Sequence, residues 1–334
     1  MAEEPDALTV GAAGLISRDP LILVVPSDSG ERILGLIPLL AQKIPQTPAT
    51  FLSPLFWHCD EATARNKADA VRNFTGQYPN HQVIFLANTL EEVALLRVAG
   101  AEAFFANHNI FADENAFYPF ADSGIEFDAV YNARPWPEKR HNLAAEIGRV
   151  IYIGYPGDLA VAARSRAITA ILQQRAPRHL FANVIVDGLP RPIARPEVNA
   201  VLARAAVGLC LSEVEGAMYA SIEYLLAGLP VVSTPSRGGR DVFFDPDYCV
   251  IAEANASAVR EAVAALRGRN IPRAYVRART LAKLEVERQR FVAFLEQIRM
   301  RSGVARAYGT QWPFSGPPFA KWQSFEIHAR EMFG

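Results

Sequence analysis

The chain has 334 residues, of which 50% are hydrophobic and 21% are charged, and its formal net charge is −1. This composition favours a folded chain over a disordered one, because it provides enough apolar surface for packed cores. A nearly neutral chain also lacks the field that attracts a nucleic-acid polyanion, so we expect no nucleic-acid partner. The length favours two domains over one.

The cysteines and the N-terminal segment favour a cytoplasmic protein. Cys59, Cys210 and Cys249 lie far apart and form no Cys-x-x-Cys pair, which suits free thiols in a reducing compartment. The first ten residues, MAEEPDALTV, are acidic and lack the basic-then-apolar pattern of a signal peptide. No apolar run approaches the ~18 residues of a membrane span, which leaves peripheral contact with the inner face of a membrane as the membrane association open to the chain.

The first part of the chain alternates predicted strands and helices. Asp60 is expected to cap the second helix and Thr89 the third, which ends at Gly100. In chain order the expected elements are a strand at 20–26, a helix at 31–43, a strand at 49–57 broken by Pro54, a helix at 60–74, a strand at 82–87, a helix at 89–98 and a strand at 102–106. This order predicts an α/β fold with a parallel sheet and helices on its faces.

A stretch without periodicity at 107–128 separates this region from a second alternation of the same kind. We expect an N-terminal domain at 1–126, a C-terminal domain at 127–307 and a tail at 308–334, whose segment 316–333 returns to the first domain as a helix. The second region is expected to contain strands at 127–131, 150–154, 183–187, 206–211 and 230–233, and helices after 141 and at 159–174, 197–205, 217–227 and much of 257–301. Two such halves place a ligand outside the carboxyl ends of the strands.

The stretch 267–306 is strongly basic, with eleven arginines and lysines beside an apolar stripe. One interpretation is a helix with a solvated charged face. The other is contact with an anionic acceptor or a membrane surface. The first is favoured, because Glu285, Glu287 and Glu296 interrupt the positive run.

The segment 209–242 carries the most specific pattern of the sequence, LCLSEVEGAMYASIEYLLAGLPVVSTPSRGGRDV. An apolar strand ends at Leu211, a short acidic loop follows, and a helix then runs to Gly228, with Pro230 beyond it as a stop signal. The next strand leads into a loop that contains Gly238 and Gly239. A loop before a helix N-terminus suits a phosphate, because unpaired N–H groups and the positive end of the helix dipole face it, and a glycine pair lets the backbone approach an anion closely.

Glu215 and Glu223 are separated by seven residues. On a helix this spacing places them on nearly one side, about 12 Å apart along the axis. Carboxylates accept hydrogen bonds from hydroxyl groups, so the pair suits the two hydroxyl-rich ends of one extended ligand. The alternative is a pair of solvent-facing glutamates on an amphipathic helix.

This segment resembles the Glu-x7-Glu region of retaining glycosyltransferases with the GT-B fold, especially glycosyltransferase family 4. That family has Ser-x-x-Glu-Gly, then Glu-Ala-x-Ala-x-Gly-x-Pro-Val-Val, then Gly-Gly. The corresponding stretches are residues 212–216, 223–232 and 238–239. The resemblance implies two Rossmann-like domains facing a central cleft, Glu215 on the donor sugar and Glu223 on the ribose. It also implies that the backbone of Gly216, Ala217 and Met218 faces the diphosphate or the sugar.

A second loop, YNARPWPEKRH at 131–141, follows the first strand of the second region. It looks like the family's Gly-Arg-x-x-x-Glu-Lys-Gly loop, with Arg134 and Lys139 on the two basic positions. The resemblance implies that both contact the donor diphosphate, Arg in a bidentate way and Lys as a point charge, and stabilise the leaving phosphate without a metal. Ala133 and Arg140 stand where the family has glycines. The alternative is an exposed basic loop.

Two features of the first region are candidates for the acceptor side. The family often has a cleft histidine at the end of a strand comparable to 102–106, and His108, followed by Asn109, matches it. His108 is expected to hydrogen-bond the donor sugar or the acceptor, with a capped loop histidine as the alternative. The turn 27–30 takes the place of the family's glycine-rich loop, and we expect its Ser29 and Gly30 to face the acceptor.

The sequence therefore predicts a glycosyltransferase in which Glu215, Arg134, Lys139 and His108 are catalytic. The resemblance implies a retaining enzyme of glycan or polysaccharide biosynthesis that moves a sugar from a UDP- or GDP-linked donor to a glycan, lipid-linked or protein hydroxyl. We expect no cofactor besides the donor and no metal, with Asp245-Pro246-Asp247 in a surface loop.

Three other functions are weighed against this one. A nucleotide-sugar epimerase on the same fold and a binding protein with a decayed site stay open, although the intact basic and acidic residues argue against decay. A Rossmann oxidoreductase is discounted, because no Gly-x-Gly-x-x-Gly follows an N-terminal strand.

Overall fold

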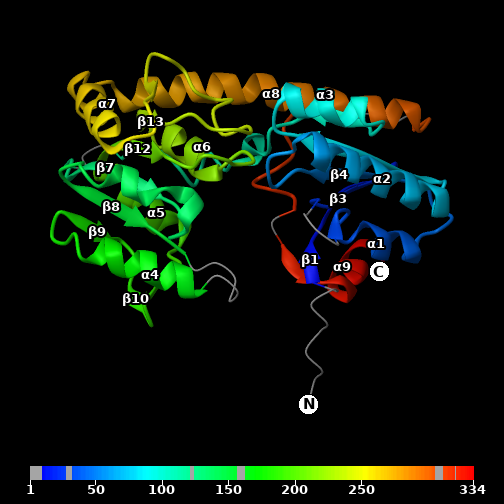
Figure 1. The fold of residues 1–334 in the computed structure, drawn as a ribbon. Helices are drawn as coiled ribbons and strands as arrows, with labels where there is room; N and C mark the ends of the chain where they lie inside the picture. The colour runs from blue at the N-terminus through cyan, green and yellow to red at the C-terminus, as the bar shows by residue number, and fades with distance from the viewer. Residues whose placement is uncertain (1–9, 28–31, 121–123, 156–161, 305–310, 320) are drawn as a thin grey trace. The chain divides into compact units, whose positions relative to one another are not determined.

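The computed structural model describes residues 10–27, 32–120, 124–155, 162–304, 311–319 and 321–334 (Figure 1). The chain forms two compact units, of which the first combines Met1–Ala112 with Glu285–Gly334 and the second is Asp113–Leu284. The predicted domain limits at 126 and 307 stay predictions, and the compact units divide at other positions. The first unit includes the last part of a long helix that begins in the second unit.

The first unit contains a five-stranded sheet in the sequential order β2-β3-β4-β5-β6. The strands β3 to β6 are parallel, and β2 is antiparallel to β3. The elements are β2 (Gly14–Arg18), β3 (Leu21–Val24), α1 (Ile37–Lys43), β4 (Ala49–Pro54), α2 (Glu61–Gln77), β5 (His81–Ala87), α3 (Leu90–Val98), β6 (Ala103–Phe105) and the short 3-10 helix η3 (His108–Phe111). The predicted parallel alternation is confirmed, whereas the antiparallel edge strand β2 was not expected.

Local side-chain caps fix the starts of α2 and α3 in the first unit. Asp60 accepts a hydrogen bond from the backbone N–H of Thr63 at 2.8 Å, and Thr89 forms a capping box with Glu92. Both predicted caps are therefore confirmed. Such caps satisfy N–H groups that have no partner inside the helix.

The two ends of the described chain meet within the first unit. The strand β1 (Val10–Ala12) pairs antiparallel with β15 (Trp322–Ser324), and α9 (Phe325–Phe333) packs against α1 and β2 (Figure 1). The buried ring of His328 bonds through Nε2 to the carbonyl oxygen of Gly11 at 3.0 Å. The predicted return of the tail to the N-terminal domain as a helix is confirmed.

The second unit is a six-stranded parallel sheet in the order β14-β13-β12-β7-β8-β9. Its chain order reverses between β7 and β12, which is the arrangement of a doubly wound Rossmann sheet. The strands are β7 (Phe127–Asn132), β8 (Val150–Ile153), β9 (His179–Phe181), β12 (Ala205–Cys210), β13 (Val231–Ser233) and β14 (Cys249–Ile251), and the helices are α4 (Ala162–Gln173), α5 (Arg195–Ala203), α6 (Tyr219–Leu226) and α7 (Ala256–Gly268).

Two predicted elements of the second unit are wrong. The loop after β7 leads into the 3-10 helices η4 (Pro137–Lys139) and η5 (His141–Ala144) instead of an α-helix, since the left-handed backbone of Arg140 interrupts the run. The predicted strand 183–187 is displaced, because β9 takes its place in the sheet. Residues 185–186 instead form the hairpin β10 (Ile185–Val186) with β11 (Leu189–Pro190). Asp187 and Gly188, at φ 51° and 73°, form its tight turn.

The basic helix α8 (Arg273–Arg301) uses several of its arginines inside the protein. Arg273 and Arg277 donate to backbone carbonyl groups of the second unit, and Arg288 donates to two in the first unit. The acceptors are Ala203, Ala205, Phe117, Leu226, Ile110 and Ala112, at 2.5 to 3.0 Å. Neither a solvated charged face nor an external anion accounts for these three residues. Among the described residues, no helix combines the length and apolar character needed to cross a membrane.

Candidate nucleotide-sugar site

Apart from Glu223, which lies on α6, the residues predicted to bind the donor lie in segments that follow strands at one edge of the sheet of the second unit. Residues 133–140 follow β7 and residues 211–218 follow β12, the two strands between which the sheet order reverses. Residues 234–240 follow β13, the neighbour of β12. In a doubly wound sheet this reversal opens a crevice at the carboxyl ends of the strands, so the three loops converge on the position where such sheets bind ligands.

An ion pair joins the first two loops. The Nζ atom of Lys139 donates to Oε1 of Glu215, and the two side chains keep only 12% and 7% of their surface exposed. The hydroxyl of Tyr131 donates to the carbonyl oxygen of Lys139 at 2.5 Å and holds the backbone that carries the ammonium group. Burial raises the pKa of Tyr131 well above its ordinary value, so the phenol keeps this proton. A nearly buried pair is screened less than a surface pair.

Glu215 does not lie on the helix that carries Glu223. The helix α6 begins at Tyr219, after a left-handed Met218 with φ 51°. Backbone pairing explains this late start, because the N–H of Glu215 donates to the carbonyl oxygen of Arg237 at 3.1 Å and keeps the segment extended. The predicted placement of both carboxylates on one side of one helix is therefore wrong.

Glu223 faces the carboxyl end of β7. Its Oε2 atom accepts a long hydrogen bond of 3.4 Å from the side-chain amide of Asn132, whose backbone N–H donates to the hydroxyl of Tyr224 at 2.5 Å. Burial raises the pKa of the half-buried Glu223 carboxyl to about 7, against the lowering influence of Arg195. The carboxyl is therefore divided between its two protonation states near neutral pH, and a hydroxyl donor from a ligand would favour the ionised form.

Arg134 is held by aromatic rings. Its guanidinium carbon lies 5.5 Å from the ring centroid of Trp136 and 5.0 Å from that of Tyr155. In the described part of the chain no carboxylate pairs with this side chain. Cation–π contact orients a guanidinium without occupying its N–H donors, so Arg134 can still present them to an anion.

Gly238 and Gly239 allow two loops of the site to pack closely against each other. A Cβ atom on Gly238, which has φ 100°, would lie 1.8 Å from the carbonyl oxygen of Glu215. The N–H of Gly239 donates to the carbonyl oxygen of Gly216 at 2.7 Å. The structure therefore gives Gly238 a packing reason, namely the close approach of residues 237–239 to residues 214–216, while the predicted approach of Gly238 and Gly239 to an anion stays a prediction. The same holds for the backbone of Gly216, Ala217 and Met218, which lies in this turn.

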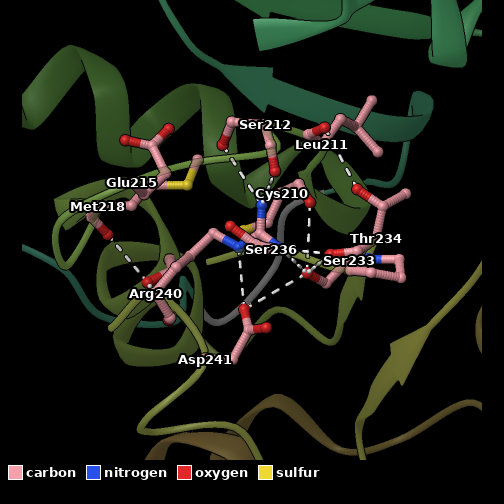
Figure 2. A network of polar contacts seen from close by, with 12 residues as sticks. Cys210, Leu211, Ser212, Glu215, Met218, Ser233, Thr234, Ser236, Arg240 and Asp241 are labelled. Carbon is pink, nitrogen blue, oxygen red and sulfur yellow. Dashed lines mark hydrogen bonds and ion pairs between the residues drawn. The ribbon is translucent and has the colours of Figure 1, made fainter. Parts of the chain in front are cut away.

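A buried arginine, which the sequence interpretation missed, holds these loops together. Arg240 is fully buried and donates to the carbonyl oxygen of Ser212 at 2.6 Å, to Oγ of Ser233 at 2.7 Å, to Asp241 at 2.9 Å and to the carbonyl oxygen of Thr234 (Figure 2). The network binds the ends of β12 and β13 to each other. A guanidinium with five donors is well suited to this task.

Arg140 occupies a position where glycine would fit the backbone. Its φ of 49° and ψ of 44° are left-handed, a conformation that costs roughly 1–2 kcal/mol for a residue with a Cβ. Its side chain offsets this cost, since Nε donates to the carbonyl oxygen of Leu211 at 2.6 Å and Nη2 to Oγ1 of Thr234 at 2.8 Å.

The predicted acceptor residues belong to the first unit. His108 and Asn109 are buried in η3, and the backbone N–H of His108 donates to the side chain of Asn88 at 3.1 Å. Burial lowers the pKa of His108 to about 4, so the ring is neutral at neutral pH. The predicted contacts of His108 and Asn109 with a sugar or acceptor stay predictions. Ser29 and Gly30 lie outside the described residues.

Asp245 corrects another expectation. It was placed in a surface loop, but only 4% of it is exposed. Arg279 donates to its carboxylate at 2.9 Å, and the ammonium of Lys283 lies at 3.2 Å. The Asp245 carboxylate is therefore already bound by two side chains of α8. Across the described residues, no group of three or more His, Cys, Asp and Glu side chains is arranged to hold a metal ion.

Comparison with known proteins finds similarity in structure and not in sequence. No protein-family model matches the chain, and no curated protein sequence matches it significantly. Among solved structures, HepE from Anabaena in complex with UDP has a TM-score of 0.56 and 13% identity, over 84% of this chain and 78% of HepE. Sucrose-phosphate synthase from Thermosynechococcus elongatus has a TM-score of 0.52 and 13% identity, over 85% and 97% of the two chains.

A third similar structure is the pneumococcal O-GlcNAc transferase GtfA in complex with UDP and GlcNAc. Its TM-score is 0.54 at 15% identity, over 82% of this chain and 56% of GtfA. These neighbours are GT-B glycosyltransferases. The chain therefore has the GT-B fold with two Rossmann-like domains, as predicted. Fold alone does not assign a reaction, which depends on the site.

Proposed function

We propose that the chain is a glycosyltransferase that binds a nucleoside-diphosphate sugar in its second unit and transfers the sugar to a hydroxyl acceptor. The observation that carries the proposal is the convergence of Lys139, Glu215, Arg134 and Glu223 at the carboxyl ends of β7 and β12, where the sheet order reverses. UDP in the HepE and GtfA structures supports a nucleoside diphosphate as the ligand class. UDP- and GDP-linked sugars are the donors to test.

Each charged residue has a separate role in this proposal. Arg134 offers a planar set of donors for the diphosphate, and Lys139 offers a compact positive charge. Glu223 accepts hydrogen bonds from the ribose hydroxyls. Glu215, beside Lys139, accepts hydrogen bonds from the sugar.

The reaction proceeds with retention of configuration and without a metal. The acceptor oxygen attacks the anomeric carbon on the face from which the diphosphate leaves, and the bond from that carbon to the phosphate oxygen breaks. The hydroxyl proton passes to the departing phosphate oxygen. Arg134 and Lys139 stabilise the charge that develops there. Glu215 is already engaged by Lys139, which favours a binding role over that of a covalent nucleophile.

A nucleotide-sugar screen tests this function. Donor binding raises the melting temperature by mass action, so the matching UDP- or GDP-sugar should stabilise the wild-type protein and Arg134→Ala should remove most of that gain. The alanine variant should lose affinity for the nucleoside diphosphate much more than for the nucleoside. Transfer to an added hydroxyl acceptor supports the proposal, whereas release of free sugar that no acceptor accelerates would support an epimerase. Absence of any nucleotide effect on the wild type would reject the site.

A further inference from the structure

Two arginines that the proposed reaction does not use hold the backbone on which the Lys139–Glu215 pair is built. Arg140 donates to the carbonyl oxygen of Leu211 at 2.6 Å, and Arg240 donates to the next carbonyl oxygen, that of Ser212, at 2.6 Å. Two consecutive carbonyl groups at the end of β12 are therefore held by guanidiniums from two different loops.

The same two arginines also share a residue at the end of β13. Arg140 donates to Oγ1 of Thr234 at 2.8 Å, and Arg240 donates to the carbonyl oxygen of Thr234. The hydroxyl of Thr234 itself donates to the carbonyl oxygen of Leu211 at 3.2 Å. The close placement of two cations is electrostatically unfavourable, and Asp241 offsets part of this repulsion through its ion pair with Arg240 at 2.9 Å. Burial and the neighbouring Arg240 both lower the pKa of Arg140, and Glu213 counteracts them. Both guanidiniums have acceptors at the ends of β12 and β13, so together they tie the loops that follow these strands to each other.

Both arginines hold segments that carry the Lys139–Glu215 ion pair. Arg140 is the residue after Lys139, so its side chain fixes the loop whose ammonium reaches Glu215. On the other side, Arg240 follows the glycine pair and holds Ser212, three residues before Glu215 (Figure 2). The hydroxyl of Ser221 donates to the carbonyl oxygen of Arg240 at 3.1 Å and ties in the first turn of α6.

We propose that Arg140 and Arg240 are positioning residues, which set the separation of Lys139 and Glu215 and thereby the affinity of the site for a diphosphate. The proposal rests on the proposed function for its ligand, and its structural part is independent of that ligand. Arg140 acts through Lys139 and does not itself touch the diphosphate. Its substitution is therefore without effect once Lys139 is gone.

The first experiment needs no ligand. Lysine acetylation by an N-hydroxysuccinimide ester, followed by mass spectrometry, reports how well Lys139 is protected in the apo protein. Arg140→Gly accepts the left-handed backbone and removes the side-chain hydrogen bonds of Arg140, and Arg140→Lys keeps the charge without the fork of donors. Both should accelerate labelling of Lys139 toward the rate in Glu215→Gln. Arg260→Lys, which alters a surface pair with Glu146 in the same unit, is the control and should leave the rate unchanged. Wild-type labelling rates in both Arg140 variants would overturn the proposal.

The second experiment is a double-mutant cycle with UDP, GDP and their nucleosides as probes in calorimetry. Arg140→Gly and Arg240→Lys should weaken binding of the matching nucleoside diphosphate roughly tenfold or more and change nucleoside binding by less than about twofold. Arg140→Gly should have no additional effect in a Lys139→Ala background. Equal losses for diphosphate and nucleoside, or additive losses in the double variant, would show general damage or direct contact and contradict the positioning role.

The two experiments separate the two proposals. Faster labelling in the Arg140 variants with no binding of either diphosphate by the wild type supports the positioning role and rejects the donor site. Binding by the wild type with unchanged labelling in the variants rejects the positioning role and leaves the donor site standing.

Discussion

The carboxyl edges of the two sheets carry different polar chemistry. In the second unit, the edge is held by charged groups, among them the Lys139–Glu215 pair and the buried Arg240. Among the described residues of the first unit, the edge carries amide and imidazole groups, such as Asn88 donating to Leu55 at 2.8 Å beside a buried His108. The sheet order reverses in the second unit, whereas the described strands of the first unit follow one another in sequence.

Among the described residues at the edge of the first unit, the buried acid Glu92 shows the same contrast. Glu92 is fully buried and accepts hydrogen bonds from the backbone N–H groups of Cys59, Asn88 and Thr89 at 2.8 to 3.2 Å. Its charge is thereby used to fix loops. Among the described residues, the charged groups of the proposed ligand site belong to the second unit. Under the proposed function, the second unit therefore binds the anionic diphosphate, and the first unit binds an uncharged hydroxyl compound.

The largest effect is expected from replacing Arg240, which holds the carboxyl edge of the sheet in the second unit. Arg240→Met removes the guanidinium donors to the carbonyl groups of Ser212 and Thr234 and should lower the unfolding free energy of the second unit by roughly 3–5 kcal/mol. Hydrogen exchange should increase in peptides covering 205–216 and 231–241. Peptides from α2 and α3 serve as the internal control, and unchanged exchange at 205–216 would contradict this view of the edge.

A second pair of substitutions separates the sugar end from the ribose end of the site. Glu215→Gln should lower kcat, because the sugar changes charge and shape in the transition state. Glu223→Gln should raise KM with kcat largely kept, because the ribose does not change. Loss of a hydrogen bond to a charged partner predicts a roughly ten- to hundred-fold effect in each case. Steady-state kinetics with the donor varied provides the test, and wild-type values for both variants would reject the site.

The pH dependence of binding should follow Glu223, whose pKa of about 7 is raised by burial. Because the ionised form accepts hydrogen bonds from the ribose, nucleotide affinity should rise by up to about tenfold between pH 6 and 8. The contribution of Glu223 to the free energy of unfolding changes with pH in the opposite direction, because its pKa in the folded protein lies above the ordinary value of 4.5. This stabilisation is fully present below pH 4.5 and is lost as the pH rises through 7.

Calorimetry and thermal unfolding over this pH range check both trends. Glu223→Gln should flatten the two curves. An equally steep affinity curve in the glutamine variant would assign the titration to another group.

A smaller effect is expected at the edge of the first unit. With its pKa lowered to about 4 by burial, His108 should stay neutral above pH 5, and His108→Gln should leave the pH profile of turnover from 5.5 to 8 unchanged in shape. Its stability contribution is present above the ordinary pKa of 6.5 and is lost as pH falls through 4. Acid unfolding of the wild type and the glutamine variant measures this difference, and a shifted turnover profile would show that His108 titrates in catalysis.

No effect is expected from chelation. Arg134 and Lys139 supply positive charge at the proposed diphosphate site, so turnover with EDTA should equal turnover with added magnesium or manganese. Assays of dialysed protein with and without each ion check this expectation. A full and reversible requirement for either ion would remove the metal-independent mechanism.

The features that were correctly predicted from the sequence are determined by residues close to each other in the chain. The caps at Asp60 and Thr89 each need only the following turn, and the parallel β/α alternation follows from periodicity. The hairpin at 185–190 was missed although Asp187-Gly188 is a typical turn pair. The apolar run before the turn resembled a buried strand, and tertiary pairing placed β9 in the sheet instead.

The candidate site residues were chosen one by one from the sequence, which does not show how they are arranged. Lys139 and Glu215 were each chosen from a local motif, while their contact depends on β7 lying next to β12. Arg240 gave no local signal, because its partners come from the ends of two strands. The helical geometry assumed for Glu215 was wrong because the pairing of residue 214 with residue 237 keeps the chain extended there.

The pairing of β1 with β15 has a consequence for how the protein is made. The strand Val10–Ala12 is synthesised about 310 residues before its partner Trp322–Ser324. At typical rates of about 5–20 residues per second, translation from residue 113 to residue 334 takes roughly ten to forty seconds. During this time the second unit can complete its sheet, because all of its strands lie between β7 and β14. The first unit therefore begins to be synthesised before the second unit and is completed after it. Until β15 is made, the edge of β1 lacks its partner strand and needs protection in the nascent chain.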